Sequence, residues 1–126
     1  MSAGASLAAP MSATVWIMMV GVPVVIAFGQ LLFKRAGEAM SGRGLDLFAL
    51  ATNPSFLVGS ALYGAATFAW VFVLKNAPLS KAYTFMALTY VMVPLLAVVF
   101  LGESVTPRFL LGMTAILGGI FIINVR

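Results

Sequence analysis

The sequence predicts an all-α membrane protein with four transmembrane helices, and three observations support this fold class. Hydrophobic residues make up 63% of the 126-residue chain and charged residues only 8%, whereas ordinary soluble domains carry roughly 25% charged residues. The few charges leave four uncharged stretches of 17–20 residues. None of these stretches has the strict polar–apolar alternation of a membrane β-barrel.

The four uncharged stretches are long enough to cross a bilayer. At about 1.5 Å per helical residue they measure roughly 25–30 Å, close to the ~30 Å hydrocarbon core. We expect helices because backbone groups in lipid must pair within their own segment. The expected spans cover residues 14–33, 56–74, 82–101 and 109–125.

The connections between the spans are short, so we expect a single domain over residues 1–126. Residues 1–13 form an uncharged tail without the basic start of a signal peptide. In the longest connection, residues 45–51 are amphipathic enough for a short helix at the membrane interface. Asn53 followed by Pro54 is typical of an N-cap and a first helical position, and indicates where a helix begins.

Composition excludes several kinds of site. The chain has no Cys and no His, which removes disulfides, thiolate or imidazole metal sites and the Ser-His-Asp triad. Its three acids, Glu38, Asp46 and Glu103, are too few for a multi-carboxylate metal site. The seven basic residues form no run that would bind nucleic acid, and there is no nucleotide-binding loop. We therefore expect no enzyme activity, metal, cofactor or nucleic-acid partner.

The charges beside the spans leave the orientation open. The basic residues divide four against three between the two sides, whereas the positive-inside rule needs a clear asymmetry. Two interpretations remain: insertion in both orientations with antiparallel pairing, or an orientation set by a partner subunit or by a few residues near the first span. One side holds Lys34, Arg35, Arg43 and Arg108, and the other holds Lys75, Lys81 and Arg126.

Polar side chains in or beside membrane spans are costly, so they mark candidate ligand contacts. Gln30 and Lys34 stand four residues apart, on one face near the end of the first span. An amide beside an ammonium group would bind a phosphate or a sugar hydroxyl. The alternative is that Lys34, with Arg35, is an ordinary anchor at the membrane edge.

Aromatic residues supply a second candidate surface. Tyr83 and Tyr90 are seven residues apart on the third span, with Met86 between them on the same face. These phenols would bind a ligand hydroxyl or stack on a sugar ring, and the alternatives are helix packing or, for Tyr83, an interfacial position. Pro94, one turn further along, is a candidate kink. Trp70 and Tyr63 on the second span are expected to pack or to line the cavity.

Glu103 is the acid closest to a membrane span. It lies on the same side as Lys34, Arg35 and Arg108, so a salt bridge that closes this side is a candidate gate. A plain ion pair at the surface would contribute little to stability.

Four segments of the chain stand in a recognisable order: GQLLFKRAG (29–37), FAWVFVLKNAPLSKAY (68–83), FLGES (100–104) and LLGMTAILGGIFIIN (110–124). These segments resemble the drug/metabolite transporter superfamily, and their order and spacing resemble its short four-helix EamA-type proteins over nearly the whole chain after Thr14. These proteins include paired small subunits that flip 4-amino-4-deoxy-L-arabinose–phosphoundecaprenol across the bacterial inner membrane. The resemblance implies a bundle of the small-multidrug-resistance/EamA type in that membrane.

The related small multidrug resistance family carries a membrane Glu eight residues before the Lys that corresponds to Lys34. That position is Ile26 in this chain, so the carboxylate that exchanges a proton for a cationic drug is missing. The Trp that follows the family's Ala-Tyr pair by three residues is Met86 here, whereas the Ala82-Tyr83 pair is retained. The resemblance therefore does not extend to cation–proton exchange by this route.

The resemblance implies a flippase subunit for a polyprenyl-phosphate-linked sugar, with an amino sugar as one candidate. Basic side chains would attract the phosphate, and amide and phenol groups would meet the sugar. Two alternatives remain: a small exporter of drugs or metabolites with altered proton coupling, and a non-transporting accessory membrane subunit. The candidate substrate-binding residues are Gln30, Lys34, Trp70, Tyr83, Tyr90, Glu103 and Arg108.

Four helices barely enclose a cavity, and transporters generally need two related halves. We therefore expect a homodimer, or a heterodimer with a similar four-helix subunit. Gly112, Ala115 and Gly119 lie three and four residues apart on one face of the last span, and small residues let helices pack closely in lipid. This face packs against a second subunit or inside the monomer, or its small residues simply reflect the high glycine content of membrane helices.

Overall fold

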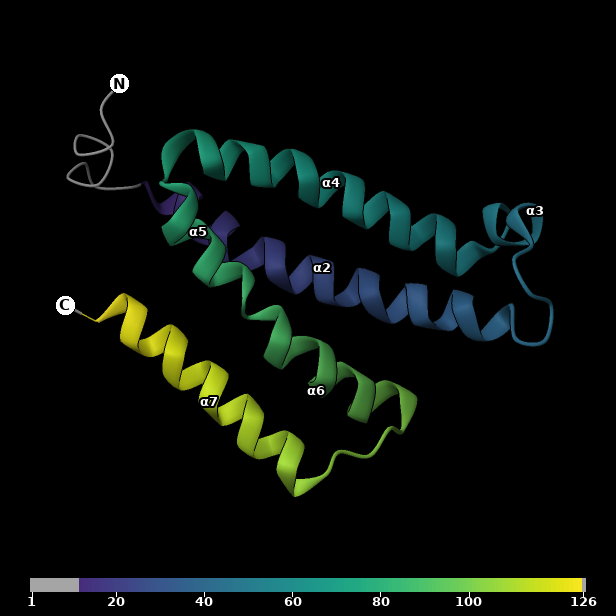
Figure 1. Ribbon diagram of the computed structural model, residues 1–126. Coiled ribbons are helices and arrows are strands. Elements are labelled where there is room, and N and C mark those ends of the chain that lie inside the picture. The colour runs from purple at the N-terminus through teal and green to yellow at the C-terminus, as the bar shows by residue number, and fades with distance from the viewer. Residues whose placement is uncertain (1–11, 126) are drawn as a thin grey trace.

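The structure is a computed structural model that describes residues 12–125, and it confirms the four expected membrane spans (Figure 1). The part of the chain that it describes contains helices and no strand. Apart from Ser12 and Ala13, the expected N-terminal tail lies outside the described residues. The helices are α2 (Ala13–Ala39), α3 (Leu47–Ala51), α4 (Pro54–Asn76), α5 (Leu79–Met86), α6 (Thr89–Leu101) and α7 (Pro107–Asn124).

α3 and α4, the two helices that follow α2, each begin at a side-chain cap. The Asn53 Oδ1 atom accepts the N–H of Phe56 at 3.2 Å, and Pro54 is the first residue of α4, as predicted. The short helix expected between the first two spans is also present, as α3. Its cap is Asp46, whose Oδ1 accepts a backbone N–H of the first turn.

The end of the first span differs from the expectation. α2 continues to Ala39, six residues beyond the predicted end at residue 33. Lys34 and Arg35 end the apolar run but not the helix, because both residue types favour helix and their long side chains reach out of the membrane. The loss of hydropathy thus marks the membrane boundary better than it marks the helix boundary.

α2 and α4 form an antiparallel pair with the most extensive contact between helices (Figure 1). The two helices approach closely at Gly29 and Gly59, and each glycine faces an aromatic ring of the other helix. A Cβ on Gly59 would lie 2.9 Å from the Phe33 ring, and a Cβ on Gly29 would lie 3.0 Å from the Tyr63 ring. These glycines therefore set the spacing of the helix pair.

A small core joins α2, α4 and α5 at the end of the bundle where α2 begins. Met19 and Val73 are fully buried there, and Trp70 packs against this core. The Nζ atom of Lys81 lies 5.1 Å from the ring centroid of Trp16, a cation–π contact at the same end. Side-chain packing across three helices thus closes this end of the molecule.

The third span is not the continuous helix that the sequence predicts, because it breaks between α5 and α6. The Thr89 hydroxyl donates to the Met86 carbonyl at 2.8 Å, and a threonine that binds its own backbone in this way often bends a helix. The N–H groups of Tyr90 and Val91 bond three residues back, in a tightened turn. Pro94 lies inside α6, so the break precedes the candidate kink.

α7 follows α6 in a hairpin and is sparsely packed (Figure 1). At its end, the Asn124 side-chain amide donates to the Thr84 hydroxyl of α5 at 3.5 Å. None of the α7 residues is buried. The helix is therefore held mainly at its two ends, which leaves room for a cleft along its length.

Candidate functional site

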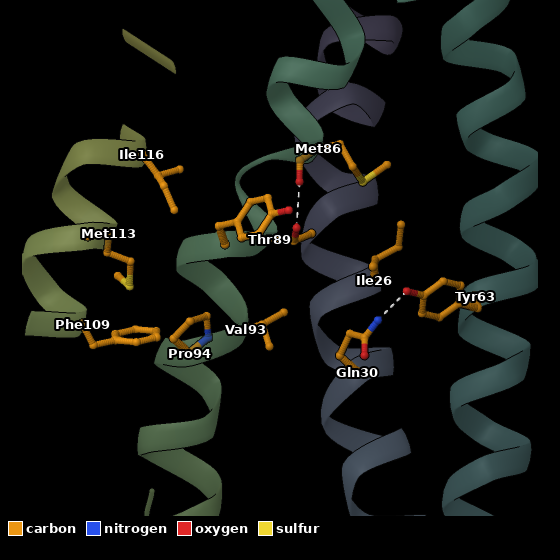
Figure 2. A pocket seen from close by; sticks show the side chains of 12 residues that line it. Ile26, Gln30, Tyr63, Met86, Thr89, Val93, Pro94, Phe109, Met113 and Ile116 are labelled. Atoms are coloured by element: carbon orange, nitrogen blue, oxygen red, sulfur yellow. Dashed lines mark hydrogen bonds between the residues drawn. The ribbon is translucent and has the colours of Figure 1, made fainter. Parts of the chain in front are cut away.

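A cleft of about 690 Å³ lies between α7 and the other three spans (Figure 2). This volume is within the range of small-molecule sites, roughly 300–1,000 Å³. Most of the wall is apolar, and the polar groups come from four side chains. The lining residues are Ile26, Gln30, Tyr63, Met86, Thr89, Tyr90, Val93, Pro94, Phe109, Gly112, Met113 and Ile116.

Gln30 and Tyr63 form the best-defined polar pair in this cleft. The Gln30 Nε2 atom donates to the Tyr63 phenol oxygen at 2.6 Å, across the α2–α4 interface (Figure 2). This bond leaves the Gln30 amide oxygen free to accept and the Tyr63 O–H free to donate. The pair therefore offers an acceptor beside a donor, which suits a ligand that carries hydroxyl groups.

Packing holds the Tyr63 ring in place. One side of the ring lies against Gly29, and the Phe33 ring stacks on it with centroids 5.3 Å apart and planes inclined by 27°. Aromatic pairs at this separation are favourable beyond their buried area. The Gln30–Tyr63 pair is thus positioned by the same contacts that hold α2 and α4 together.

The broken third span supplies the opposite wall of the cleft. Met86 and Thr89 lie at the break, and Pro94 follows on α6 (Figure 2). Tyr90, also on α6, lines the cleft as well. Pro94 has no N–H, so the carbonyl four residues earlier, at Tyr90, lacks its usual helical donor. Tyr90 is well exposed, with 61% of the residue's surface accessible. Polar groups therefore face the cleft from α6 as well as from α2 and α4.

A second, smaller cavity of about 180 Å³ adjoins the cleft, because the two share Gln30 and Val93 as walls. It lies between α2 and the end of α6, and it is lined by one cation, Lys34, and one anion, Glu103. Its other lining residues are Leu31, Ala97 and Leu101.

The structure brings together some of the candidate residues. Gln30 and Tyr90 line the cleft, while Lys34 and Glu103 line the adjoining cavity, which Gln30 shares. The sequence-based pairing of Gln30 with Lys34 on one face of the helix is therefore reflected in a common cavity.

Three other candidates lie elsewhere. Trp70 packs against the core at the end of the bundle where α2 begins. Tyr83 is 64% exposed on α5 and lines neither cavity. Arg108 is the second residue of α7, exposed and outside both cavities.

The salt bridge that was a candidate gate is not formed in this structure. Among residues 12–125, no pair of charged atoms within 4.0 Å joins Glu103 to Lys34, Arg35 or Arg108. Lys34 and Glu103 nevertheless face the same small cavity. Both charged groups are therefore available to a third group between them.

The small residues of α7 have free space around them. A Cβ at Gly112 or Gly119 would meet nothing within 4 Å among the described residues, and Ala115 is exposed. Gly112 also lines the cleft.

Tyr63, which the sequence predicts to pack or to line the cavity, does both in the structure, but its pairing with Gln30 was not predicted. A signal for it exists, because Gly29–Phe33 in the first span and Gly59–Tyr63 in the second have the same spacing of four. Each glycine accepts the aromatic ring of the other helix. A glycine followed four residues later by an aromatic residue, in both helices of a hairpin, therefore indicates a close crossing.

Ile26 also lines the cleft, at the position where the small multidrug resistance family carries its carboxylate. None of the twelve lining residues is acidic or basic. The cleft itself is thus uncharged, and the charged side chains are confined to the adjoining cavity.

Comparison with known proteins finds one family and several similar chains. The EamA-like transporter family matches residues 1–125. A protein of Escherichia coli O157:H7, named a probable 4-amino-4-deoxy-L-arabinose-phosphoundecaprenol flippase subunit ArnE, is 34% identical over 87% of this chain and 96% of its own length. A protein of the same name from Yersinia pestis is 30% identical over 86% of this chain and 95% of its own length. No solved structure matches the chain significantly.

Proposed function

The chain belongs to the EamA-like transporter family, and on that premise we propose that it is one subunit of a flippase for a polyprenyl-phosphate-linked sugar. Similar proteins that match over nearly their whole length are named as subunits of such a flippase. With four apolar helices of membrane-spanning length, the chain is a multi-pass protein of the bacterial inner membrane. The proposed activity is transport, with no bond made or broken in the substrate.

The observation that carries this proposal is the chemistry of the cleft. Gln30, Tyr63, Thr89 and Tyr90 offer uncharged donors and acceptors from both walls of a 690 Å³ space. Such groups suit the hydroxyls of a sugar, and the phenol rings suit its apolar face. A carboxylate able to exchange a proton for a drug cation is not among the cleft's lining residues, where Ile26 stands instead.

The phosphate of the substrate would sit beside the sugar, at Lys34. This ammonium group faces the adjoining cavity, and Gln30 is common to both spaces. A cation at the membrane boundary can bind a phosphate without a large desolvation cost, because its long side chain stays close to water. The sugar and phosphate would therefore occupy neighbouring parts of one continuous site.

The prenyl tail would remain in the lipid. The outer faces of α6 and α7 are apolar and exposed, as Val99, Leu111 and Ile122 illustrate with 64–73% of each side chain accessible. Only the polar head group would then need to cross through the protein.

A second subunit would complete the site, since transporters generally use two related halves around a central site. α7 forms one wall of the cleft yet has no buried residue. Its small residues Gly112, Ala115 and Gly119 leave room for close approach of another helix. We propose that this face contacts a second copy, or a similar four-helix subunit.

Native mass spectrometry of the protein purified from its own bacterial membrane tests the proposed substrate. We expect a retained mass that corresponds to a polyprenyl phosphate carrying one sugar, and its loss in Gln30→Ala. The matched control is Gly64→Ala, a small change in a span at a position with free space around it. Retention of ordinary phospholipid alone, by a protein that moves quaternary ammonium drugs in liposomes, would contradict the proposal and favour a small drug exporter.

A further inference from the structure

We propose that Glu103 binds a positively charged amine on the sugar while Lys34 binds the phosphate, so that this end of the site selects a zwitterionic head group. The inference rests on the proposed function and names the residue that distinguishes an amino sugar from a neutral one. It assigns to Glu103 a role in specificity instead of a role in closing the site.

The first observation is the placement of the two charges. Lys34 reaches the small cavity from α2, and Glu103 reaches it from the turn after α6. No ion pair within 4.0 Å joins them in the described part of the chain. Opposite walls of one cavity therefore present a cation and an anion that do not neutralise each other.

The second observation is that the backbone fixes the position of Glu103. Gly102 ends α6 in the left-handed conformation, with φ of 68°, which favours glycine. The N–H groups of Gly102 and Glu103 both bond to the Ala97 carbonyl, and Ala97 itself lines the cavity. The backbone of Glu103, the first residue after the cap, is thus held against the last turn of α6 by its own N–H group.

The third argument is electrostatic. A phosphate gains from Lys34, but in a space this small it is also repelled by Glu103. Glu103 is exposed in the free protein, and a neutral sugar bound over its carboxylate would exclude water without providing a charged partner, which is unfavourable. An ammonium group on the sugar removes both penalties. The cavity therefore favours a head group with both charges and disfavours one that carries the phosphate alone.

The sugar hydroxyls would meet the Gln30–Tyr63 pair in the same pose. Gln30 lines both spaces, so a head group bound between Lys34 and Glu103 lies next to the free amide oxygen of Gln30. Recognition of the charges and recognition of the hydroxyls thus occur at adjoining positions.

Transport of three water-soluble probes by the reconstituted protein tests this inference. Each probe is a citronellyl-phosphate-linked pentose, with a 4-amino, a 4-acetamido or a 4-hydroxyl group. We expect the wild type to take up the 4-amino probe about tenfold better than the other two, the size of one charge-assisted hydrogen bond. Glu103→Gln should lose this preference and still transport the 4-hydroxyl probe, whereas Glu103→Asp should retain most of it.

Two further variants separate recognition from closure. Glu38→Gln removes an exposed acid at the same end of α2, outside both cavities, and should keep the preference. The double variant Lys34→Glu with Glu103→Lys exchanges the two charges. It would keep a gate that depends only on an ion pair between these positions. It should not restore the preference, because the phosphate would then face a carboxylate.

The outcomes are distinct. Equal uptake of the three probes by the wild type, an unchanged preference in Glu103→Gln, or recovery in the charge-swapped variant overturns the role of Glu103 in specificity. Failure of the wild type to take up any of the three probes instead overturns the proposed function.

Discussion

At the scale of single residues, the cleft depends on a pair of side chains that only one helix crossing brings together. Gln30 and Tyr63 are 33 positions apart in the sequence, and their hydrogen bond spans the α2–α4 interface. Gln30 was predicted as a ligand contact because a polar side chain within a membrane span is energetically costly. Sequence reasoning predicted that Tyr63 packs or lines the cavity but not that it pairs with Gln30, because a hydrogen-bond partner on another helix is not visible along the chain.

Replacing Tyr63 by Phe tests the polar pair. The ring would keep its contacts with Gly29 and Phe33, so the unfolding free energy should change by less than about 1 kcal/mol. The rate of lipid-linked sugar uptake into proteoliposomes should fall about 2- to 10-fold, as expected for one lost hydrogen bond. The control is Thr67→Val, which removes a hydroxyl one turn along α4 that bonds to its own helix. Equal losses in the two variants would refute a specific role for Tyr63.

Replacing Lys34 by Gln tests the phosphate contact. We expect KM for the 4-amino probe to rise about 3- to 10-fold, because a charged donor is lost at the edge of the membrane. The KM of the wild type should rise with salt concentration, and that of Lys34→Gln should rise less. Arg43→Gln, in the exposed connection at the same end of α2, serves as the matched control. A KM that is unchanged in Lys34→Gln would remove Lys34 from the site and leave it as a membrane anchor.

At the scale of the helices, the four spans could be predicted because the chain has so few charged residues. The exact helix ends and the break within the third span could not. Hydropathy identified all four membrane segments. The extension of α2 beyond Lys34 was missed, because helix and membrane need not end at the same residue. The break before Thr89 was missed because an apolar pattern does not reveal where backbone N–H groups bond three residues back, as those of Tyr90 and Val91 do.

The crossing of α2 and α4 depends on Gly59 in a way that stability measurements can test. Gly59→Ala would place a methyl group 2.9 Å from the Phe33 ring and 3.3 Å from the Gly29 carbonyl oxygen. We expect a loss of about 1–3 kcal/mol, as in other overpacked sites. Thermal unfolding of the purified protein in detergent measures this loss.

The matched control for that change is Gly64→Ala, on the same helix. Nothing lies within 4 Å of a Cβ at Gly64, so the alanine should be neutral or stabilise the protein by up to about 1 kcal/mol. If both alanine variants lower the midpoint of thermal unfolding equally, close packing at Gly59 is not the cause of the lost stability.

At the scale of the whole molecule, one end of the bundle is packed and the far helix is only loosely attached. Met19, Val73 and their neighbours join α2, α4 and α5, whereas α7 buries no residue. The sequence predicted the small-residue face of α7 but left its partner open. A Cβ at Gly112 or Gly119 would meet nothing within 4 Å among residues 12–125, so there is space beside them for a second subunit.

Bulky side chains on α7 test this assembly. The double variant Ala115→Leu with Gly119→Leu changes two positions outside the cleft, one turn apart. We expect it to fold and to lose the dimer seen by chemical cross-linking in membranes, because close approach of the helices is blocked. Thr114→Leu adds bulk on another face of α7 and should leave the dimer intact. A dimer that survives in the double variant would place the subunit contact elsewhere.

Uptake of the citronellyl-phosphate-linked 4-amino pentose into proteoliposomes tests the central claim most directly. The protein should be purified from its own membrane with any subunit that accompanies it. We expect time-dependent uptake by the wild type, unchanged uptake by Thr67→Val and a loss of at least tenfold in Gln30→Ala, which removes the polar group shared by both cavities. Uptake of quaternary ammonium drugs coupled to protons, with none of the lipid-linked sugar probe, would contradict this claim.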